Sequence, residues 1–190
     1  MAGVAGPMLK RSKARGARFL AGLWIGGMVA SAVLATAVFA VGSLAVWLIP
    51  SLVRQIIAGV LLVLFALLDL AARTPHVWRQ VPVEHLKTMP PGKLGVVWGF
   101  DLSLLFTTQK STSLTWVALT GLVLLAPGAS WWTLCGMTTV TVLMVVGRSI
   151  VFQLRGPARL GDFRQSWFHW VRRASGVALV GVAAYVMLGA

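Results

Sequence analysis

A polar run interrupts a long apolar stretch in the second half of the chain. Residues 94–126 are otherwise apolar, and the run in their middle reads Thr107-Thr108-Gln109-Lys110-Ser111-Thr112-Ser113. A straight helix over this stretch would measure about 50 Å, whereas the hydrocarbon core of a bilayer is about 30 Å thick. The stretch is therefore either two crossings joined by a surface turn or one crossing by a broken helix. Unwound backbone at membrane depth needs shielding by protein or a cavity, so a break would mark a functional site.

The side chains around the break could bind a small solute. Hydroxyl groups can ligate an ion, cap the ends of a broken helix or bind an oxyanion, and Lys110 adds a positive charge. We expect a substrate-binding site lined by Asp101, Thr107, Thr108, Lys110 and Thr112. The alternative is an ordinary turn at the outer surface.

Asp101 is a carboxylate in apolar sequence, between Phe100 and Leu102. A lone buried carboxylate costs several kcal/mol, so we expect it to pair with a cation or to hold a proton. Candidate cations are Lys110, Arg148 and Arg54. Alternatively, Asp101 is solvated near the headgroups, because only about 12 Å of helix separates it from Lys93.

Other polar residues in the apolar runs have structural interpretations. Asp69 and Arg73 are four residues apart, the spacing of an ion pair on one helix. Thr138, Thr139 and Thr141 could face the break, but bonding to carbonyls of their own helix is the commoner outcome.

Composition places the chain among polytopic α-helical membrane proteins. Of its 190 residues 58% are hydrophobic and 11% are charged, which is more apolar surface than a soluble domain of this size could bury. The apolar runs are continuous, whereas a membrane β-barrel would show alternating segments. The net charge is +13, and the basic residues that produce it lie almost entirely between the apolar runs. We therefore expect the basic residues to set topology and contact anionic lipid headgroups, with no nucleic-acid partner.

Catalytic and cofactor-binding patterns are missing from the sequence. The one cysteine, Cys135, cannot form a disulfide within the chain, and we expect it to be a small buried residue. His76, His85 and His169 lack metal-ligand spacing, and there is no HExxH, Walker or GxGxxG motif. We expect neither an enzyme nor a bound metal or cofactor.

The apolar runs predict membrane helices at residues 19–49, 52–72, 131–154 and 167–190, besides the interrupted run. Turns are expected at Pro50-Ser51 and at residues 127–130, and polar loops at 73–93 and 155–166. The prolines of Met89-Pro90-Pro91-Gly92 should prevent a regular helix from running through the loop at 73–93. Residues 1–18 are predicted to be a disordered basic cytoplasmic tail, and residues 19–190 a single transmembrane domain.

Charge distribution predicts the orientation of the helices. The tail, the loop at 73–93 and residues 155–173 are rich in Arg and Lys, whereas the two short turns carry almost no charge. Placing all three basic stretches in the cytoplasm requires residues 94–126 to cross a net odd number of times. The expected fold is therefore all-α, with five helices including a broken third; six crossings remain the alternative. We expect a multi-pass protein of the cell membrane with a cytoplasmic N-terminus.

Two segments open in the same way, namely Gly22-Leu23-Trp24-Ile25-Gly26 and Gly95-Val96-Val97-Trp98-Gly99. Each run then extends to a turn proline, Pro50 or Pro127. Internal repeats of this kind are common in transporter folds, although similar composition alone could produce the likeness.

The run Val171-Arg172-Arg173-Ala174-Ser175-Gly176, which continues as an aliphatic stretch to Tyr185, resembles the last helix of a known superfamily. That superfamily includes the cytochrome c biogenesis and thiol-disulfide electron carrier proteins and the sulfite and amino-acid exporters. Residues 95–108 resemble its Gly-rich segment that runs to a break, but Thr107-Thr108 stands where the electron carriers have Cys-Pro. The resemblance implies a fold of this kind, and the missing pair argues against electron transfer.

These features lead to two functional hypotheses. The first is a small transporter or exporter of a small polar or anionic solute, with its site at the break. The second is a non-transporting accessory or assembly subunit that docks another membrane protein through Gly-rich helix faces.

Overall fold

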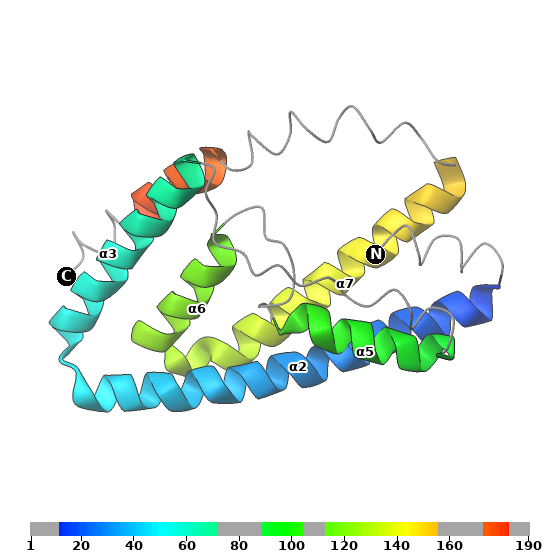
Figure 1. Ribbon diagram of the computed structural model, residues 1–190, viewed down its shortest axis with the longest axis horizontal. Coiled ribbons are helices and arrows are strands. Elements are labelled where there is room, and N and C mark those ends of the chain that lie inside the picture. Colours follow the sequence, from blue (N-terminus) through cyan, green and yellow to red (C-terminus); the bar gives the residue numbers. More distant parts are fainter. Residues whose placement is uncertain (1–11, 72–88, 105–112, 156–172, 183–190) are drawn as a thin grey trace. The chain divides into compact units, whose positions relative to one another are not determined.

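The computed structural model describes residues 12–71, 89–104, 113–155 and 173–182 (Figure 1). Within these residues the protein is all-α, without a strand. The chain divides into two compact units. The first unit comprises Met1–Leu34, Trp78–Thr108 and Trp131–Leu160, and the second comprises Ala35–Val77, Gln109–Ser130 and Gly161–Ala190.

The helices follow the predicted apolar runs. They are α2 (Lys13–Leu48), α3 (Ser51–Leu70), α5 (Pro91–Ser103), α6 (Leu114–Leu124), the 3-10 turn η1 (Pro127–Ala129), α7 (Ser130–Arg155) and a final helix, Arg173–Val182. The predicted turns at Pro50-Ser51 and at residues 127–130 are confirmed. The interrupted run forms two separate helices, α5 and α6, and residues 105–112 between them lie outside the described part.

Two helices begin earlier than the sequence predicted. α2 begins at Lys13, inside the expected basic tail, where the Ser12 hydroxyl accepts a hydrogen bond from the Arg15 N–H at 3.4 Å. Lys, Arg and Ala are good helix formers, so this stretch can extend the apolar helix. α5 begins at Pro91, inside the loop that we predicted at 73–93. Proline is well tolerated at the first helical position, because its missing N–H would have no partner in the helix.

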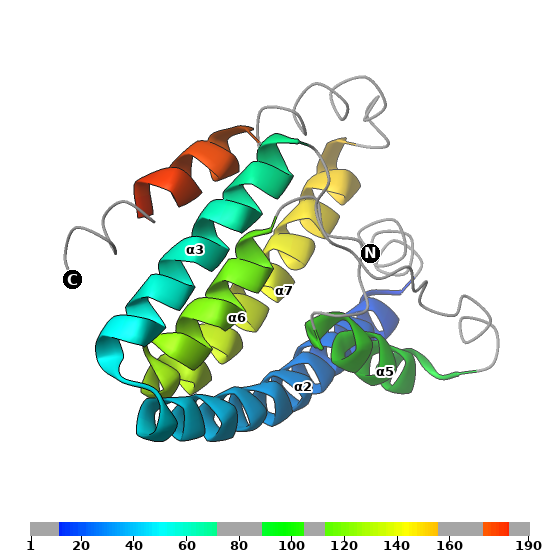
Figure 2. The same ribbon diagram turned by 60° about the vertical axis from the view of Figure 1, so that its left-hand side comes forward.

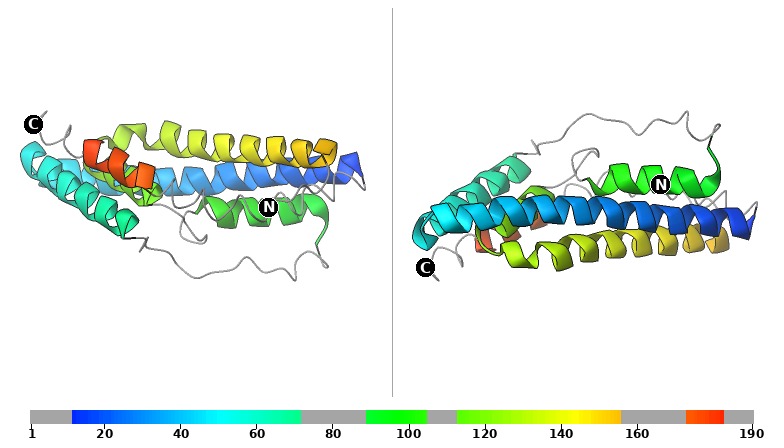
Figure 3. Two further views of the ribbon diagram at one scale, coloured as in Figure 1. Left: turned by 90° about the horizontal axis from the view of Figure 1, so that it is seen from above. Right: turned by 90° about the horizontal axis from the view of Figure 1, so that it is seen from below.

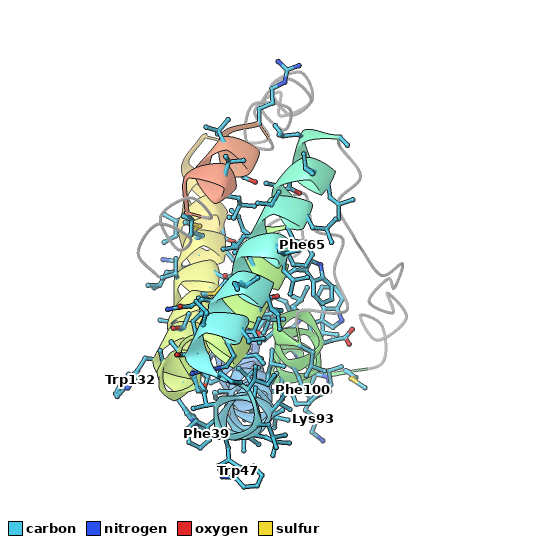
Figure 4. All side chains as sticks on the ribbon, turned by 90° about the vertical axis from the view of Figure 1, so that its left-hand side faces the viewer. Phe39, Trp47, Phe65, Lys93, Phe100 and Trp132 are labelled. Carbon is cyan, nitrogen blue, oxygen red and sulfur yellow. The ribbon has the colours of Figure 1, made fainter. Side chains whose placement is uncertain are left out.

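Among the described residues, three helices are long and apolar enough to cross a membrane, namely Lys13–Leu48, Ser51–Leu70 and Pro127–Gly147. The shorter helices Leu114–Leu124 and Arg173–Val182 are also apolar. Many large apolar side chains are exposed, and two of the most exposed are Trp47 (81%) and Trp132 (86%), labelled in Figure 4. Apolar helices with apolar outer surfaces are compatible with a membrane location.

The first unit is built on a close contact between α2 and α5, which run side by side in Figure 3. A Cβ atom at Gly26 would overlap the Val96 carbonyl oxygen, and one at Gly99 would overlap the Leu23 carbonyl. The glycines recur at four-residue spacing, which allows membrane helices to approach closely: Gly22 and Gly26 on α2, and Gly95 and Gly99 on α5. The two segments that open alike in the sequence thus pack against each other.

These two helices run parallel. Gly22 lies against Gly92 at the start of α5, whereas Gly27 lies against Ser103 at its end, with 2.9 Å between a Cβ built on Gly27 and the Ser103 hydroxyl oxygen. The basic first turns of α2 and α5 therefore lie at the same end of the first unit.

α7 packs against α2 in the opposite direction. The hydroxyls of Ser31 and Thr138 are hydrogen-bonded and buried, and Val142 and Val145, further along α7, pack near the start of α2. They meet a buried cluster of Phe19, Leu23, Leu94 and Trp98, in which the Phe19 and Trp98 rings are T-shaped at 6.0 Å. The end of α7, at Arg155, therefore lies at the same end of the unit as the starts of α2 and α5.

The second unit contains α3, α6 and the final helix. Leu62 and Ala66 on α3 form a buried cluster with Leu179 of the final helix, and Val117 of α6 packs against it. Figure 2 shows the final helix and α6 beside α3. This packing brings α6 and the final helix, which are far apart in sequence, together at the C-terminal half of α3.

Candidate functional site

Asp69 is a buried carboxylate at the C-terminal end of α3, with a side chain only 1% exposed. It accepts hydrogen bonds from two other segments of the second unit. The Ser113 backbone N–H lies 2.9 Å from both Oδ1 and Oδ2, and the Ser113 hydroxyl donates to Oδ1 at 2.8 Å. The Ser175 hydroxyl donates to Oδ2 at 2.8 Å. We call these three residues the Asp69 cluster.

The cluster lies at the N-terminus of α6. Ser113 directly precedes α6, and its own hydroxyl does not cap the helix. The first N–H groups of a helix have no intrahelical partner and carry partial positive charge, which favours a carboxylate. Asp69 therefore acts as an N-terminal cap that is supplied by a neighbouring helix.

Ser175 connects the same carboxylate to the final helix. It lies in the first turn of Arg173–Val182, next to Gly176. A Cβ atom at Gly176 would lie 3.0 Å from the Leu70 side chain and 3.5 Å from the Ala66 carbonyl oxygen. The glycine thus lets the final helix come close enough to α3 for Ser175 to reach Asp69.

Arg54, near the start of α3, contacts the other end of α6. Its Nε donates to the Ile49 carbonyl at 3.1 Å, and its Nη1 donates to the Leu124 carbonyl at 2.9 Å. These carbonyls lie at the C-terminal ends of α2 and α6, where cations interact favourably with the helix dipole. Because Asp69 meets the start of α6 and Arg54 meets its end, α3 and α6 are antiparallel.

The hydrogen bonds offset the cost of removing the Asp69 carboxylate from water, which is several kcal/mol for an unpaired ion. The donors come from α6 and the final helix, so the same bonds fix both elements to α3. Among the described residues, no group of three or more His, Cys, Asp or Glu side chains could hold a metal ion.

Of the five predicted site residues, only Asp101 lies in the described part. It is half-buried on α5, in the first unit. Thr107, Thr108, Lys110 and Thr112 lie outside the described residues. Ser113, the last residue of the polar run, is buried and belongs to the Asp69 cluster.

The sequence interpretation missed Asp69 as a site residue. The predicted ion pair of Asp69 with Arg73 is not tested, because Arg73 lies outside the described residues. Asp69 is buried against Ser113 and Ser175, near the end of α3. The available signal was an acidic residue near the end of a long apolar run. That signal does not identify partners that come from distant parts of the chain.

The predictions for α7 are partly confirmed. Thr139 and Thr141 donate to carbonyls of their own helix, at 3.0 and 2.7 Å, whereas Thr138 bonds Ser31 on α2. Cys135 was expected to be buried but is half-buried.

Comparisons with known proteins gave no match. No protein-family model, no curated protein sequence and no solved structure matches this chain.

Proposed function

We propose that the chain is a small membrane transporter or exporter of a small polar or anionic solute, with its site at the interruption between α5 and α6. The observation that carries the proposal is the Asp69 cluster, a buried carboxylate at the start of the short helix that follows the interruption. Ionisable residues inside membrane segments are uncommon and mark functional sites by default. Membrane proteins with broken helices commonly bind solutes and ions at the ends of the half-helices.

The lengths of α5 and α6 support a broken crossing. α5 has 13 residues and α6 has 11, so they measure about 20 and 17 Å. Each is shorter than the hydrocarbon core of about 30 Å, so neither would cross a bilayer alone.

The basic ends of the first unit support five crossings, with the broken segment as the third. α5 starts and α7 ends at the same end of the unit, and α7 is long enough for one crossing. The chain from the start of α5 to the start of α7 would then cross a net single time. α2 starts at the same end of the unit. Because the starts of α2 and α5 and the end of α7 are all basic, this end is proposed to be cytoplasmic, together with the N-terminus.

The Asp69 cluster also limits how a solute would bind. The start of α6 already faces a carboxylate of the chain, so an anionic solute would need other donors. In the proposed site these are Lys110 and the hydroxyls of Thr107, Thr108 and Thr112, with Asp101 on the α5 side. The resemblance to the sulfite and amino-acid exporters is in keeping with such a solute, and it forms part of this proposal.

An accessory or assembly subunit is the second candidate. The glycine faces of α2 and α5 are used within the first unit, which disfavours them as docking faces. α7 carries two further glycines on one face, Gly136 and Gly147, and a Cβ at either would have no neighbour within 4 Å among the described residues. This open glycine face is the observation in favour of the second candidate.

Flux into proteoliposomes tests the proposal. Asp101→Asn and Lys110→Ala should each reduce flux of the transported solute, while a control variant, Thr141→Val, should not, because Thr141 bonds only its own helix carbonyl among the described residues. Unchanged flux in both site variants would overturn the site assignment. No flux with any small anion or amino acid would favour the accessory subunit. Accessibility of a cysteine at Ser111, in a Cys135→Ser background, separates a surface turn from a shielded break.

A further inference from the structure

The basic end of the first unit carries exposed cations on two touching helices. Arg15 and Arg18 lie in the first turns of α2, and Lys93 lies in the first turn of α5; all three side chains are exposed. The Arg18 carbonyl oxygen is 3.9 Å from a Cβ built on Gly92, so Arg18 lies beside the first turn of α5. The glycine contact between the helices thus brings cations from both within reach of one ligand.

Nothing acidic balances these charges within the first turns. α2 and α5 have no acidic residue there, and the residue preceding α5, Pro90, provides no side-chain cap. Helix N-termini are themselves positive ends of dipoles, so adjacent cations are unfavourable unless an anion is present. Two parallel N-termini and three cations at one end therefore fit an anionic ligand.

An exposed apolar row continues from the cations on each helix. On α2, Ile25 and Val29 follow Arg18 at spacings of seven and eleven residues; on α5, Val97 and Phe100 follow Lys93 at four and seven. Figure 4 shows Lys93 and Phe100 projecting from the same side of α5.

The two rows lie on the same side of the α2–α5 pair. At about 100° per residue, the α2 row lies about 60° from the direction of Gly22 and Gly26, and the α5 row lies about 150° from the direction of Gly95 and Gly99. Seen along the helix axes, the row on α2 and the row on α5 are displaced from the glycines in opposite directions around their helices. Because the two helices are parallel and their glycines face each other, both rows therefore lie on one side of the pair. The pair therefore presents a positive end joined to an apolar surface.

We propose that this surface binds an anionic phospholipid, with its phosphate at Arg15, Arg18 and Lys93 and an acyl chain along Ile25, Val29, Val97 and Phe100. A soluble anion would use only the cations, whereas a lipid matches both the charge and the apolar rows. This inference is independent of the proposed transport function, because it uses no residue of the interruption.

Native mass spectrometry of the full chain in detergent tests the proposal. The wild type should bind phosphatidylglycerol more tightly than phosphatidylcholine with the same acyl chains. Each cation near an anionic lipid surface contributes about fivefold, so Arg15→Gln/Arg18→Gln/Lys93→Gln should lose on the order of 100-fold in phosphatidylglycerol affinity. Arg15→Lys/Arg18→Lys/Lys93→Arg, which keeps the charges, should retain most of it.

A matched control separates this site from general surface charge. Lys10→Gln/Arg11→Gln/Lys13→Gln also removes three positive charges, but Lys13 lies on the opposite side of α2 by helical spacing. This control should lose less than about fivefold. Equal losses in both triple variants, no lipid preference in the wild type, or full competition by millimolar inorganic phosphate would each overturn the proposal. If the triple variant fails to fold, the three single Gln variants, expected to lose about fivefold each, replace it.

Discussion

Asp69 and Arg54, about four turns apart on α3, contact opposite ends of α6. The carboxylate meets the positive end of the α6 dipole and the guanidinium meets its negative end. α3 thus carries the charges that a short helix needs at both of its termini. α6 has 11 residues, and helices of that length are marginal without such support.

Removing the carboxylate should destabilise the protein strongly. In Asp69→Ala, three buried donors lose their acceptor, so we expect a loss of about 3 kcal/mol or more in unfolding free energy. Ser175→Ala removes one bond to a charged acceptor and should cost about 1.5–3 kcal/mol. Denaturant unfolding in detergent measures both values.

Ser149→Ala is the matched control for Ser175→Ala. Ser149 is also buried, but its hydroxyl donates to the Val145 carbonyl of its own helix at 2.7 Å. Such bonds add little to helix stability, so we expect a loss of about 0.5 kcal/mol or less. Equal losses for the two serines would contradict the role given to the Asp69 cluster.

Arg54→Lys should loosen the C-terminal end of α6 while keeping the positive charge. The guanidinium donates to two carbonyls, of Ile49 and Leu124, whereas an ammonium on a flexible stem does not reproduce that fork. We expect a loss of about 1 kcal/mol and faster amide hydrogen exchange in the last turn of α6. Arg15→Lys, at an exposed position, serves as the control. Unchanged exchange in α6 would show that the charge alone holds its end.

The sequence predicted the apolar helices well, because continuous apolar runs and turn prolines determine where they begin and end. Pro50 and Pro127 mark the two turns as expected. The predicted helix boundaries are wrong where polar sequence borders an apolar run. Lys13 and Pro91 belong to helices because local propensity and the first-turn tolerance of proline outweigh the polar composition.

The candidate site could be predicted only in part. The polar run identified Ser113 as part of an unusual segment, but Asp69 and Ser175 are far from it in sequence. Their convergence depends on how α3, α6 and the final helix pack, and in particular on Gly176. A single sequence shows which residue types are present, but it does not show which of them form hydrogen bonds with one another in the fold.

Adding a methyl group at the α2–α5 contact should separate the two helices. A Cβ atom at Gly26 would overlap the Val96 backbone carbonyl, which cannot rotate away as a side chain could. We therefore expect Gly26→Ala to cost about 1–3 kcal/mol in unfolding free energy. Gly136→Ala is the control: its Cβ would have no neighbour within 4 Å among the described residues, so alanine should be neutral or stabilise α7 by up to about 1 kcal/mol. Similar effects at the two positions would argue against close contact of the backbones.

The arrangement of the first unit predicts which residues are accessible from the same side of a membrane. α2 and α5 start, and α7 ends, at one end of the unit, and the turn with Gly128 precedes the start of α7. In a Cys135→Ser background, single cysteines at Lys13 and Lys93 should therefore react with an impermeant maleimide from one side, and a cysteine at Gly128 from the other. Oriented membrane vesicles, labelled before and after permeabilisation, provide the measurement.

Reaction of Lys13 and Lys93 cysteines from opposite sides would rule out the parallel α2–α5 pair in the membrane. Reaction of all three from one side would instead contradict a single net crossing between the starts of α5 and α7, because α5 and α6 would then have to enter and leave by the same face.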